Sequence, residues 1–371
     1  MFEKLSVTDL TIQFDTRDGL IQPVDHVSFE IEQGQHVGLI GESGCGKTVT
    51  ALSILGFERG VPGIVKGKIE LNGQNILPDF SHFFDSKTEI AYEKKQNWRR
   101  WEKALSLSLS PFLGTVFSMI FQDGSKMLDP LFTIGKQLVE ALKLSDEMKN
   151  KSKMDLKREA CFWLNRLEMP EPEKTFSQYP HQLSGGMIQR VVIAMALASK
   201  PSLLIADEPT TALDVTVASK ILRLLKALCT EEELTLLVIS HNLAVIRELT
   251  QKVIVMYAGQ IVEILPSHDL LPERIKHPYA KALLDAQISD LVIATNSLQA
   301  IPGEVPKPSE QIYGCRFHPR CFLVKEKQEQ GMQDFADRCK TQPPSLSILE
   351  ENQSVRCWAH TEVPVKETLQ S

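Results

Sequence analysis

The sequence predicts an α/β fold with a parallel β-sheet, and three features carry that prediction. Short apolar runs of strand length alternate along the chain with longer segments whose apolar residues recur at helical spacing. One apolar run, residues 36–40, leads into a glycine-rich turn, after which residues 48–57 have a helical pattern. A second run, residues 203–206, is followed directly by two acidic residues. Strands that alternate with helices in this way form parallel sheets, whose ligands bind at the carboxyl ends of the strands.

The other expected elements surround this core. Alternating or continuous apolar runs predict further strands over residues 5–14, 27–31 and 234–239. Apolar residues at helical spacing predict helices over residues 138–144, 156–167 and 215–229. The first two of these helices fall within an expected helical subdomain from about residue 123 to 189. After Val262 the chain is rich in proline and irregular, so we expect a small appended unit there and no further sheet strands.

Composition argues against several broad classes of protein. A formal charge of −6 and a pI near 5.9 give no general attraction to nucleic acid, which is therefore not an expected partner. The longest apolar stretches, residues 191–198 and 234–239, are far shorter than the roughly 20 residues that span a bilayer. The first residues lack a basic segment followed by an apolar core, so we expect no signal peptide and a cytosolic protein.

Residues 41–48 read Gly-Glu-Ser-Gly-Cys-Gly-Lys-Thr and match the pattern of a phosphate-binding loop. Glycines allow backbone N–H groups to surround phosphates, Lys47 can reach the terminal phosphates, and Thr48 can hold Mg²⁺. A glycine-rich turn without a ligand is the alternative, but the strand before the loop and the helix after it favour a phosphate site. We therefore predict that ATP is bound by Gly41, Ser43, Gly44, Cys45, Gly46, Lys47 and Thr48.

The acidic pair after the second apolar run is Asp207 and Glu208. Its position at the carboxyl end of a predicted strand places Asp207 where a phosphate-bound Mg²⁺ is expected. Glu208 can then orient the water that attacks the terminal phosphate. An ordinary turn with two acids is the alternative, and the phosphate loop in the same chain favours the catalytic interpretation.

A serine and two glycines, Ser184, Gly185 and Gly186, open another helical segment between the phosphate loop and the acidic pair. With those two motifs on either side, they resemble the signature motif of the ATP-binding cassette (ABC) family. The resemblance covers roughly residues 1–285 and implies a P-loop NTPase core of the RecA-like type, with an antiparallel β part and a helical subdomain. It also implies a nucleotide-binding domain over 1–260 and a small, irregular, cysteine-containing C-terminal extension over 261–371.

The chain matches further motifs of this family. Gln122 matches the glutamine that senses Mg²⁺ and water, and His241 matches the switch histidine that contacts the terminal phosphate. Residues 212–214 match the loop that touches the opposite subunit, and Phe14 matches the aromatic residue that stacks on adenine. Because cassettes of this family pair head to tail, the resemblance implies that the partner's ATP is contacted by Ser184, Gly185 and Gly186.

Residues 179–187 and 207–216, together with the phosphate loop, resemble the ATPases of the dipeptide, oligopeptide and nickel importer subfamily. Residues 277–280, 301–306 and 314–321 look like the C-terminal extension of those ATPases. The resemblance implies an ATPase that powers peptide uptake from the cytoplasmic face of the inner membrane. It implies as partners a similar but non-identical ATPase, two membrane permeases and, indirectly, an extracytoplasmic substrate-binding protein. Nickel uptake, antimicrobial-peptide uptake and a soluble non-transport cassette stay as alternatives.

The last cysteines of the chain, Cys315, Cys321, Cys339 and Cys357, form a separate group. A reducing cytosol argues against structural disulfides, so the group points to metal chemistry or to free thiols. Some members of the subfamily carry a 4Fe–4S cluster at such a group, and the resemblance implies one here. The gap between Cys321 and Cys339 is longer than is usual in the subfamily, which keeps zinc and free buried thiols as alternatives.

Residues 76–114 are longer than the link that the subfamily has at this place. Trp98 and Trp101 lie among lysines and arginines there, and such a cluster can bind nucleic acid or lipid headgroups. The simpler interpretation, which we favour, is a surface insertion with a solvated helix.

Overall fold

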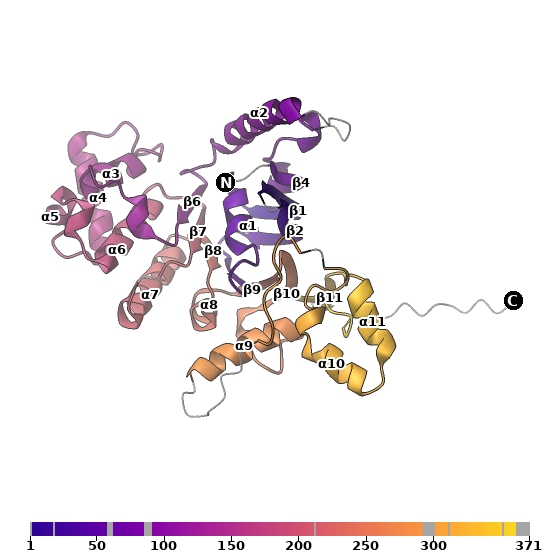
Figure 1. Ribbon diagram of the computed structural model, residues 1–371. Helices are drawn as coiled ribbons and strands as arrows, with labels where there is room; N and C mark the ends of the chain where they lie inside the picture. The colour runs from indigo at the N-terminus through magenta and orange to yellow at the C-terminus, as the bar shows by residue number, and fades with distance from the viewer. Residues whose placement is uncertain are drawn as a thin grey trace.

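The computed structural model describes residues 2–17, 19–57, 62–84, 91–210, 213–291, 301–310, 312–350 and 352–360. Two sheets organise the described residues, a four-stranded sheet in the order β2-β1-β4-β5 and an eight-stranded sheet in the order β11-β12-β10-β9-β3-β8-β7-β6. Both lie near the centre of the molecule, with the helices arranged around them (Figure 1). This arrangement confirms the predicted α/β class.

The middle of the larger sheet is parallel, with β9, β3, β8, β7 and β6 paired in that order. Its strands are β3 (His36–Ile40), β6 (Phe117–Ile120), β7 (Leu203–Asp207), β8 (Thr235–Ile239) and β9 (Lys252–Tyr257). Every residue of β3, β7 and β8 is buried, which explains their continuous apolar sequences. Helices α1 (Lys47–Ile54), α7 (Val215–Glu231) and α8 (Leu243–Leu249) follow β3, β7 and β8 along the chain. The carboxyl ends of these strands therefore meet at one edge of the sheet.

The smaller sheet is antiparallel and comes mostly from the start of the chain. Its strands are β1 (Lys4–Thr16), β2 (Gly19–Glu32), β4 (Pro62–Leu71) and β5 (Gln74–Asn75). The second half of β2 alternates buried and exposed residues, because one face packs on a core and the other faces solvent. That core is shared with α1 and with one face of the parallel strands. The small sheet thereby packs against α1, the helix that begins at the phosphate loop.

Four helices form the segment that the sequence predicts to be a helical subdomain. They are α3 (Ile134–Leu142), α4 (Lys153–Arg166), α5 (Pro172–Ser177) and α6 (Gly185–Ala198). Side chains cap three of them, because Thr133, Ser152 and Ser184 each accept a hydrogen bond from the first turn. The group lies to one side of the sheets, on the left of Figure 1. Its last helix, α6, leads directly into β7 and so connects the subdomain to the parallel sheet.

The insertion contains one long helix, α2 (Ala91–Leu109), which lies beside β4 at the top of Figure 1. Arg99 and Arg100 are exposed, as expected of a surface helix. Trp101 is only 1% exposed, however, and its ring packs edge-on against Phe80. The expectation of a solvated helix is therefore wrong for one face of α2, because aromatic residues before the helix give its tryptophan a partner.

The C-terminal extension is more regular than the sequence predicts. It contains α9 (Pro278–Leu291), α10 (Phe322–Glu329), α11 (Gln333–Thr341), β11 (Ser347–Glu350) and β12 (Gln353–Val355). The β11–β12 hairpin pairs antiparallel with β10 (Gln260–Pro266), which itself pairs with β9. The expectation of no further sheet strands is wrong, because two strands this short leave too little alternation in the sequence. The division of the chain near residue 260 stays a prediction.

Of the helices in the described part of the chain, none combines the length and the apolar character that crossing a bilayer requires.

Candidate active site

The phosphate loop joins β3 to α1 and depends on glycine at two positions. Gly41 has a φ of +152° and Gly46 a φ of +100°, a region that other residues rarely adopt. A Cβ atom on Gly41 would lie 2.2 Å from the carbonyl oxygen of Met256, and one on Gly46 would lie 2.2 Å from that of Pro23. The loop is therefore pressed against neighbouring backbone on two sides, and a side chain at either position would displace it.

Lys47 is the first residue of α1 and is 7% exposed. Its ammonium group donates hydrogen bonds to the carbonyl oxygens of Gly41, at 2.8 Å, and Glu42, at 2.9 Å. These acceptors are neutral and belong to the loop itself. A phosphate held by the loop would offer charged oxygens instead, which accept hydrogen bonds from an ammonium group more strongly. The buried ammonium group of Lys47, which has these neutral acceptors, is therefore suited to bind an anion.

Thr48 and Asp207 meet across the edge of the parallel sheet. The Thr48 hydroxyl donates a 2.9 Å hydrogen bond to Oδ2 of Asp207, the last residue of β7. Asp207 is 4% exposed, and burial raises the pKa of its carboxyl group, as does the neighbouring charge of Glu208. A divalent cation would favour the charged carboxylate and offset both effects. A hydroxyl beside a buried carboxylate gives oxygen ligands of the kind that Mg²⁺ takes.

Two further predicted residues, Gln122 and His241, converge on Glu208. Its N–H group donates to the Ile239 carbonyl of β8 at 2.9 Å, and its φ of +45° is unusual for a residue other than glycine. The carboxylate accepts a 2.9 Å hydrogen bond from the Gln122 amide and lies 3.0 Å from Nδ1 of His241. Gln122 follows β6, Glu208 follows β7 and His241 follows β8, so adjacent parallel strands deliver all of them to one edge.

The signature residues lie at the start of α6. Ser184 is exposed, and its hydroxyl oxygen accepts a 3.4 Å hydrogen bond from the Met187 N–H group. A Cβ atom on Gly186 would approach a Val217 methyl group to 3.1 Å, so this end of α6 packs closely against α7. Ala212 of the predicted subunit-contact loop lies outside the described residues, while Asp214 caps α7. An exposed helix N-terminus suits contact with an anion from elsewhere, and the role of these residues stays a prediction.

Phe14 lies near the end of β1 and is partly buried. It lines a pocket together with Val49 and Leu52 of α1 and with Phe57. Because α1 begins at the phosphate loop, the ring lies beside the helix that would hold the nucleotide's phosphates. Adenine stacking by Phe14 stays a prediction.

Comparison with known proteins identifies the family. Residues 24–211 match the model described as ABC transporter, and residues 262–327 match the model of the oligopeptide/dipeptide transporter C-terminal region. The chain is 36% identical over 353 residues, 95% of each chain, to a protein named dipeptide transport ATP-binding protein DppD from Escherichia coli (strain K12). It is 38% identical to the oligopeptide transport ATP-binding protein AppD of Bacillus subtilis (strain 168), over 96% of this chain and 97% of the relative. The chain belongs to the ABC transporter family.

Solved structures agree on the fold of this ABC ATPase. The ATP-binding cassette MJ0796, in a dimeric post-hydrolysis state bound to ADP and Pi, matches with a TM-score of 0.54 at 24% identity. That match covers 71% of this chain and 98% of the other. The cassette cbiO1 of Clostridium perfringens matches with a TM-score of 0.54 at 19% identity, over 79% of this chain and 95% of the other. Identities this low establish the fold alone.

Three residues of the ABC ATPase reach the site although sequence reasoning assigned them no role there. Arg320 forms an ion pair with Glu42 of the phosphate loop, and the Tyr279 hydroxyl accepts a 2.7 Å hydrogen bond from the Glu42 N–H group. Gln287 contacts the backbone at His241. All three lie in the C-terminal extension. Tyr279 and Arg320 come more than 200 positions after Glu42, the phosphate-loop residue that both contact. No sequence motif marks such a contact, although Tyr279 and Arg320 both fall in segments that resemble the subfamily.

The four C-terminal cysteines of this ABC ATPase lie together. Cys315, Cys321, Cys339 and Cys357 line one small cavity with His277 and Phe317. Burial raises the pKa of each thiol, to about 11 for Cys315 and about 12 for Cys339 and Cys357, and nearby cysteines add to the shift at these three. Among the described residues, no three His, Cys, Asp or Glu side chains are placed to hold one metal ion.

Proposed function

We propose that this ABC ATPase powers the uptake of dipeptides or oligopeptides across a membrane. The observation that carries the proposal is the match of residues 262–327 to the oligopeptide/dipeptide transporter C-terminal region, beside a complete set of ATP-site residues. Relatives named for dipeptide and oligopeptide transport align with almost the whole chain. Nickel uptake, antimicrobial-peptide uptake and a soluble cassette function are the alternatives to be tested against it.

The residues of the site divide the work of hydrolysis. Lys47 would neutralise the terminal phosphates, while Thr48 and Asp207 would hold Mg²⁺ with help from Gln122. Glu208 orients the attacking water, because its carboxylate lies at the sheet edge between Gln122 and His241. His241 contacts the terminal phosphate. Mg²⁺, when bound, supplies charge neutralisation, and the rest of the catalysis is positioning and electrostatic stabilisation by these side chains.

The exposed signature residues support a second cassette as a partner. Ser184, Gly185 and Gly186 sit at an exposed helix end, where they are available to cap ATP bound to a second cassette. The cassette MJ0796 is itself described as dimeric. We expect a similar but non-identical ATPase as this chain's partner, two permeases above the pair and an extracytoplasmic binding protein that delivers the peptide. The complex would hold this chain at the cytoplasmic face of the inner membrane.

The four buried thiols are proposed to hold a 4Fe–4S cluster. Cysteine thiolates are the usual ligands of such a cluster, and the four cysteines that line this cavity would hold it. Binding of iron would offset the raised thiol pKa values, because a cation favours the thiolate. The cluster supplies, when bound, a covalent link between segments of the extension. Equal amounts of iron and sulfide after anaerobic purification, lost in Cys339→Ser, are expected; iron-free protein or zinc alone would contradict the assignment.

Transport in cells tests the proposed function. A strain that lacks this subunit should lose uptake of radiolabelled dipeptides or oligopeptides, and the wild-type gene should restore it while the Glu208→Gln variant should not. A panel of peptides of different length, nickel salt and an antimicrobial peptide is measured in the same strains. Loss of nickel uptake alone, or no transport defect with every substrate, would contradict peptide import.

A further inference from the structure

The C-terminal extension holds the phosphate loop through a charged side chain. The Arg320 guanidinium, 5% exposed, forms two hydrogen bonds with the Glu42 carboxylate, Nη1 to Oε2 at 2.8 Å and Nη2 to Oε1 at 3.1 Å. Its Nε donates to the carbonyl of Pro302 at 2.9 Å, and Nη1 also reaches the Tyr257 hydroxyl at 3.3 Å. Both edges of the guanidinium are thus fixed, and a two-point contact of this geometry sets the orientation of its carboxylate partner.

Glu42 is itself part of the phosphate-binding machinery. Its N–H group donates to the Tyr279 hydroxyl at 2.7 Å, and its carbonyl oxygen accepts from the Lys47 ammonium at 2.9 Å. A carboxylate within a loop that must surround a triphosphate opposes anion binding unless its charge is offset. Arg320 provides that offset from a buried position, where an ion pair is weakly screened by solvent.

A second contact links the extension to the loop that carries His241. The Gln287 amide of α9 donates through Nε2 to the His241 carbonyl oxygen, and its Oε1 accepts a 2.8 Å hydrogen bond from the Leu243 N–H group. One side chain therefore spans the start of the turn between β8 and α8. The imidazole of His241, on the same residue, lies 3.0 Å from Glu208. The backbone held by Gln287 is the backbone that places this imidazole.

We propose that the extension positions the ATP site, with Arg320 acting on ATP affinity through Glu42 and Gln287 acting on turnover through His241. Arg320 acts through Glu42 and Gln287 acts through His241, so both are positioning residues. Both roles need only the use of ATP by this chain and do not depend on which substrate is transported. A defect in transport specificity would leave both roles unaffected, and the tests below measure ATP binding and hydrolysis alone.

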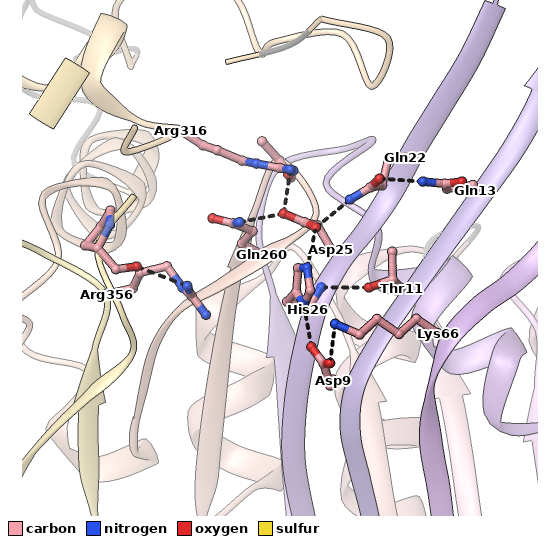
Figure 2. Close-up of polar contacts among 12 residues, drawn as sticks. Asp9, Thr11, Gln13, Gln22, Asp25, His26, Lys66, Gln260, Arg316 and Arg356 are labelled. Atoms are coloured by element: carbon pink, nitrogen blue, oxygen red, sulfur yellow. Dashed lines mark hydrogen bonds and ion pairs between the residues drawn. The ribbon is translucent and has the colours of Figure 1, made fainter. Parts of the chain in front are cut away.

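Arg316 supplies a matched control, because it is a second arginine from the same segment and pairs with Asp25, a core acid that is not part of the phosphate loop. Its Nη2 lies 2.7 Å from Asp25 Oδ2, and its Nη1 donates to the Ala258 carbonyl. Figure 2 shows Asp25 between Arg316, Gln260 and Gln22. Arg316→Met removes an ion pair between the extension and the core, as Arg320→Met does, but leaves Glu42 paired.

The test for Arg320 is a double-mutant comparison in the full-length chain. Binding of Mg²⁺ with a non-hydrolysable ATP analogue is measured by calorimetry, and folding is monitored by thermal unfolding. Arg320→Met should weaken binding by about tenfold, because it leaves a carboxylate unpaired in the loop, whereas Arg316→Met should not. Glu42→Gln combined with Arg320→Met should restore binding to within about threefold of the wild type, because no charge then needs to be offset.

A purely structural role for Arg320 predicts a different result. If the double variant binds as weakly as Arg320→Met, or if Arg320→Met binds normally, the proposed effect on affinity is wrong. Should Arg320→Met fail to fold, Arg320→Lys keeps the charge without the two-point geometry and should weaken binding less than Arg320→Gln. Equal affinities for the lysine and glutamine variants would overturn the charge argument.

The test for Gln287 separates kcat from KM. Gln287→Leu should lower the kcat of ATP hydrolysis by about fivefold in the transporter complex purified through this chain, with little change in KM, because His241 is misplaced while the phosphate loop is intact. Lys281→Gln, an exposed change on the same helix, serves as the control. A change in KM without a change in kcat, or no change in either, would contradict the role assigned to Gln287.

Discussion

The two segments that are added to the cassette core, the α2 insertion and the C-terminal extension, differ in their polar contacts with the ATP site. In the insertion, Trp101 and Leu105 are buried, and the tryptophan packs on the rings of Phe80 and Phe83. In the extension, Arg320 and Gln287 bind individual atoms of the loops that form the ATP site. Apolar burial stabilises a segment without directing any one atom, whereas hydrogen bonds and ion pairs fix the direction of both partners. The insertion should therefore affect stability, and the extension should affect ATP use.

The largest expected effect is on ATP hydrolysis and comes from a change in the site itself. The effects of changes in the two segments are compared with it. Glu208→Gln keeps the shape of the side chain but removes the charge that orients water, so kcat should fall by about 10²–10⁴-fold while ATP still binds. Hydrolysis and equilibrium binding are measured on the same preparation. Near-normal hydrolysis by this variant would refute the role given to Glu208. It would also remove the ATP site against which the two segments are compared.

Replacement of the buried tryptophan tests the insertion. Trp101→Ala should lower the free energy of unfolding by about 3–5 kcal/mol, because a large ring is lost from among Phe80 and Phe83. Denaturant unfolding measures the loss, with the exposed neighbour change Arg100→Ala as control. ATP affinity of the folded variant should stay at the wild-type value. Weakened ATP binding under fully folded conditions would show that the insertion, too, positions the site.

Loss of one hydroxyl tests the extension at the smallest scale. Tyr279→Phe keeps the ring that packs on Tyr257 and Phe317 but leaves the Glu42 N–H group without its acceptor. The variant should lose about 1–3 kcal/mol of unfolding free energy and bind ATP more weakly than the wild type. Tyr313→Phe is the matched control, because Tyr313 is 68% exposed. If stability falls and ATP affinity does not, Tyr279 stabilises the extension without positioning the loop.

The ATP-site motifs were accessible from the sequence because each is short and local. The loop from Gly41 to Thr48 needs glycine at positions of positive φ, and Asp207 ends a strand that is fully buried. Glu208 is predicted from its place after an apolar strand, and Gln122 and His241 are predicted by resemblance. The parallel sheet brings all of them together at one edge because their strands are neighbours. Residues that follow neighbouring strands of a parallel sheet lie close together at one edge, so their proximity can be predicted with few side-chain details.

The two wrong expectations, a fully solvated α2 helix and no sheet strands in the C-terminal extension, share a physical cause. The burial of Trp101 depends on Phe80, which lies about twenty positions earlier and faces it only after the insertion has folded. The hairpin of β11 and β12 has too few residues for a periodic signal and owes its pairing to the free edge of β10. In both cases the partner, and not the segment's own composition, decided the structure.

The sequence by itself determined the fold class, the phosphate loop and the family, because these depend on local backbone requirements and on residue order. Only the tertiary structure decided that the four C-terminal cysteines surround one cavity and that Arg320 and Gln287 reach the ATP site. Such contacts join residues separated by as many as 278 positions, as Glu42 and Arg320 are. The strength of these contacts depends on the desolvation and the geometry of each pair, and both are set only after the two segments have been packed together.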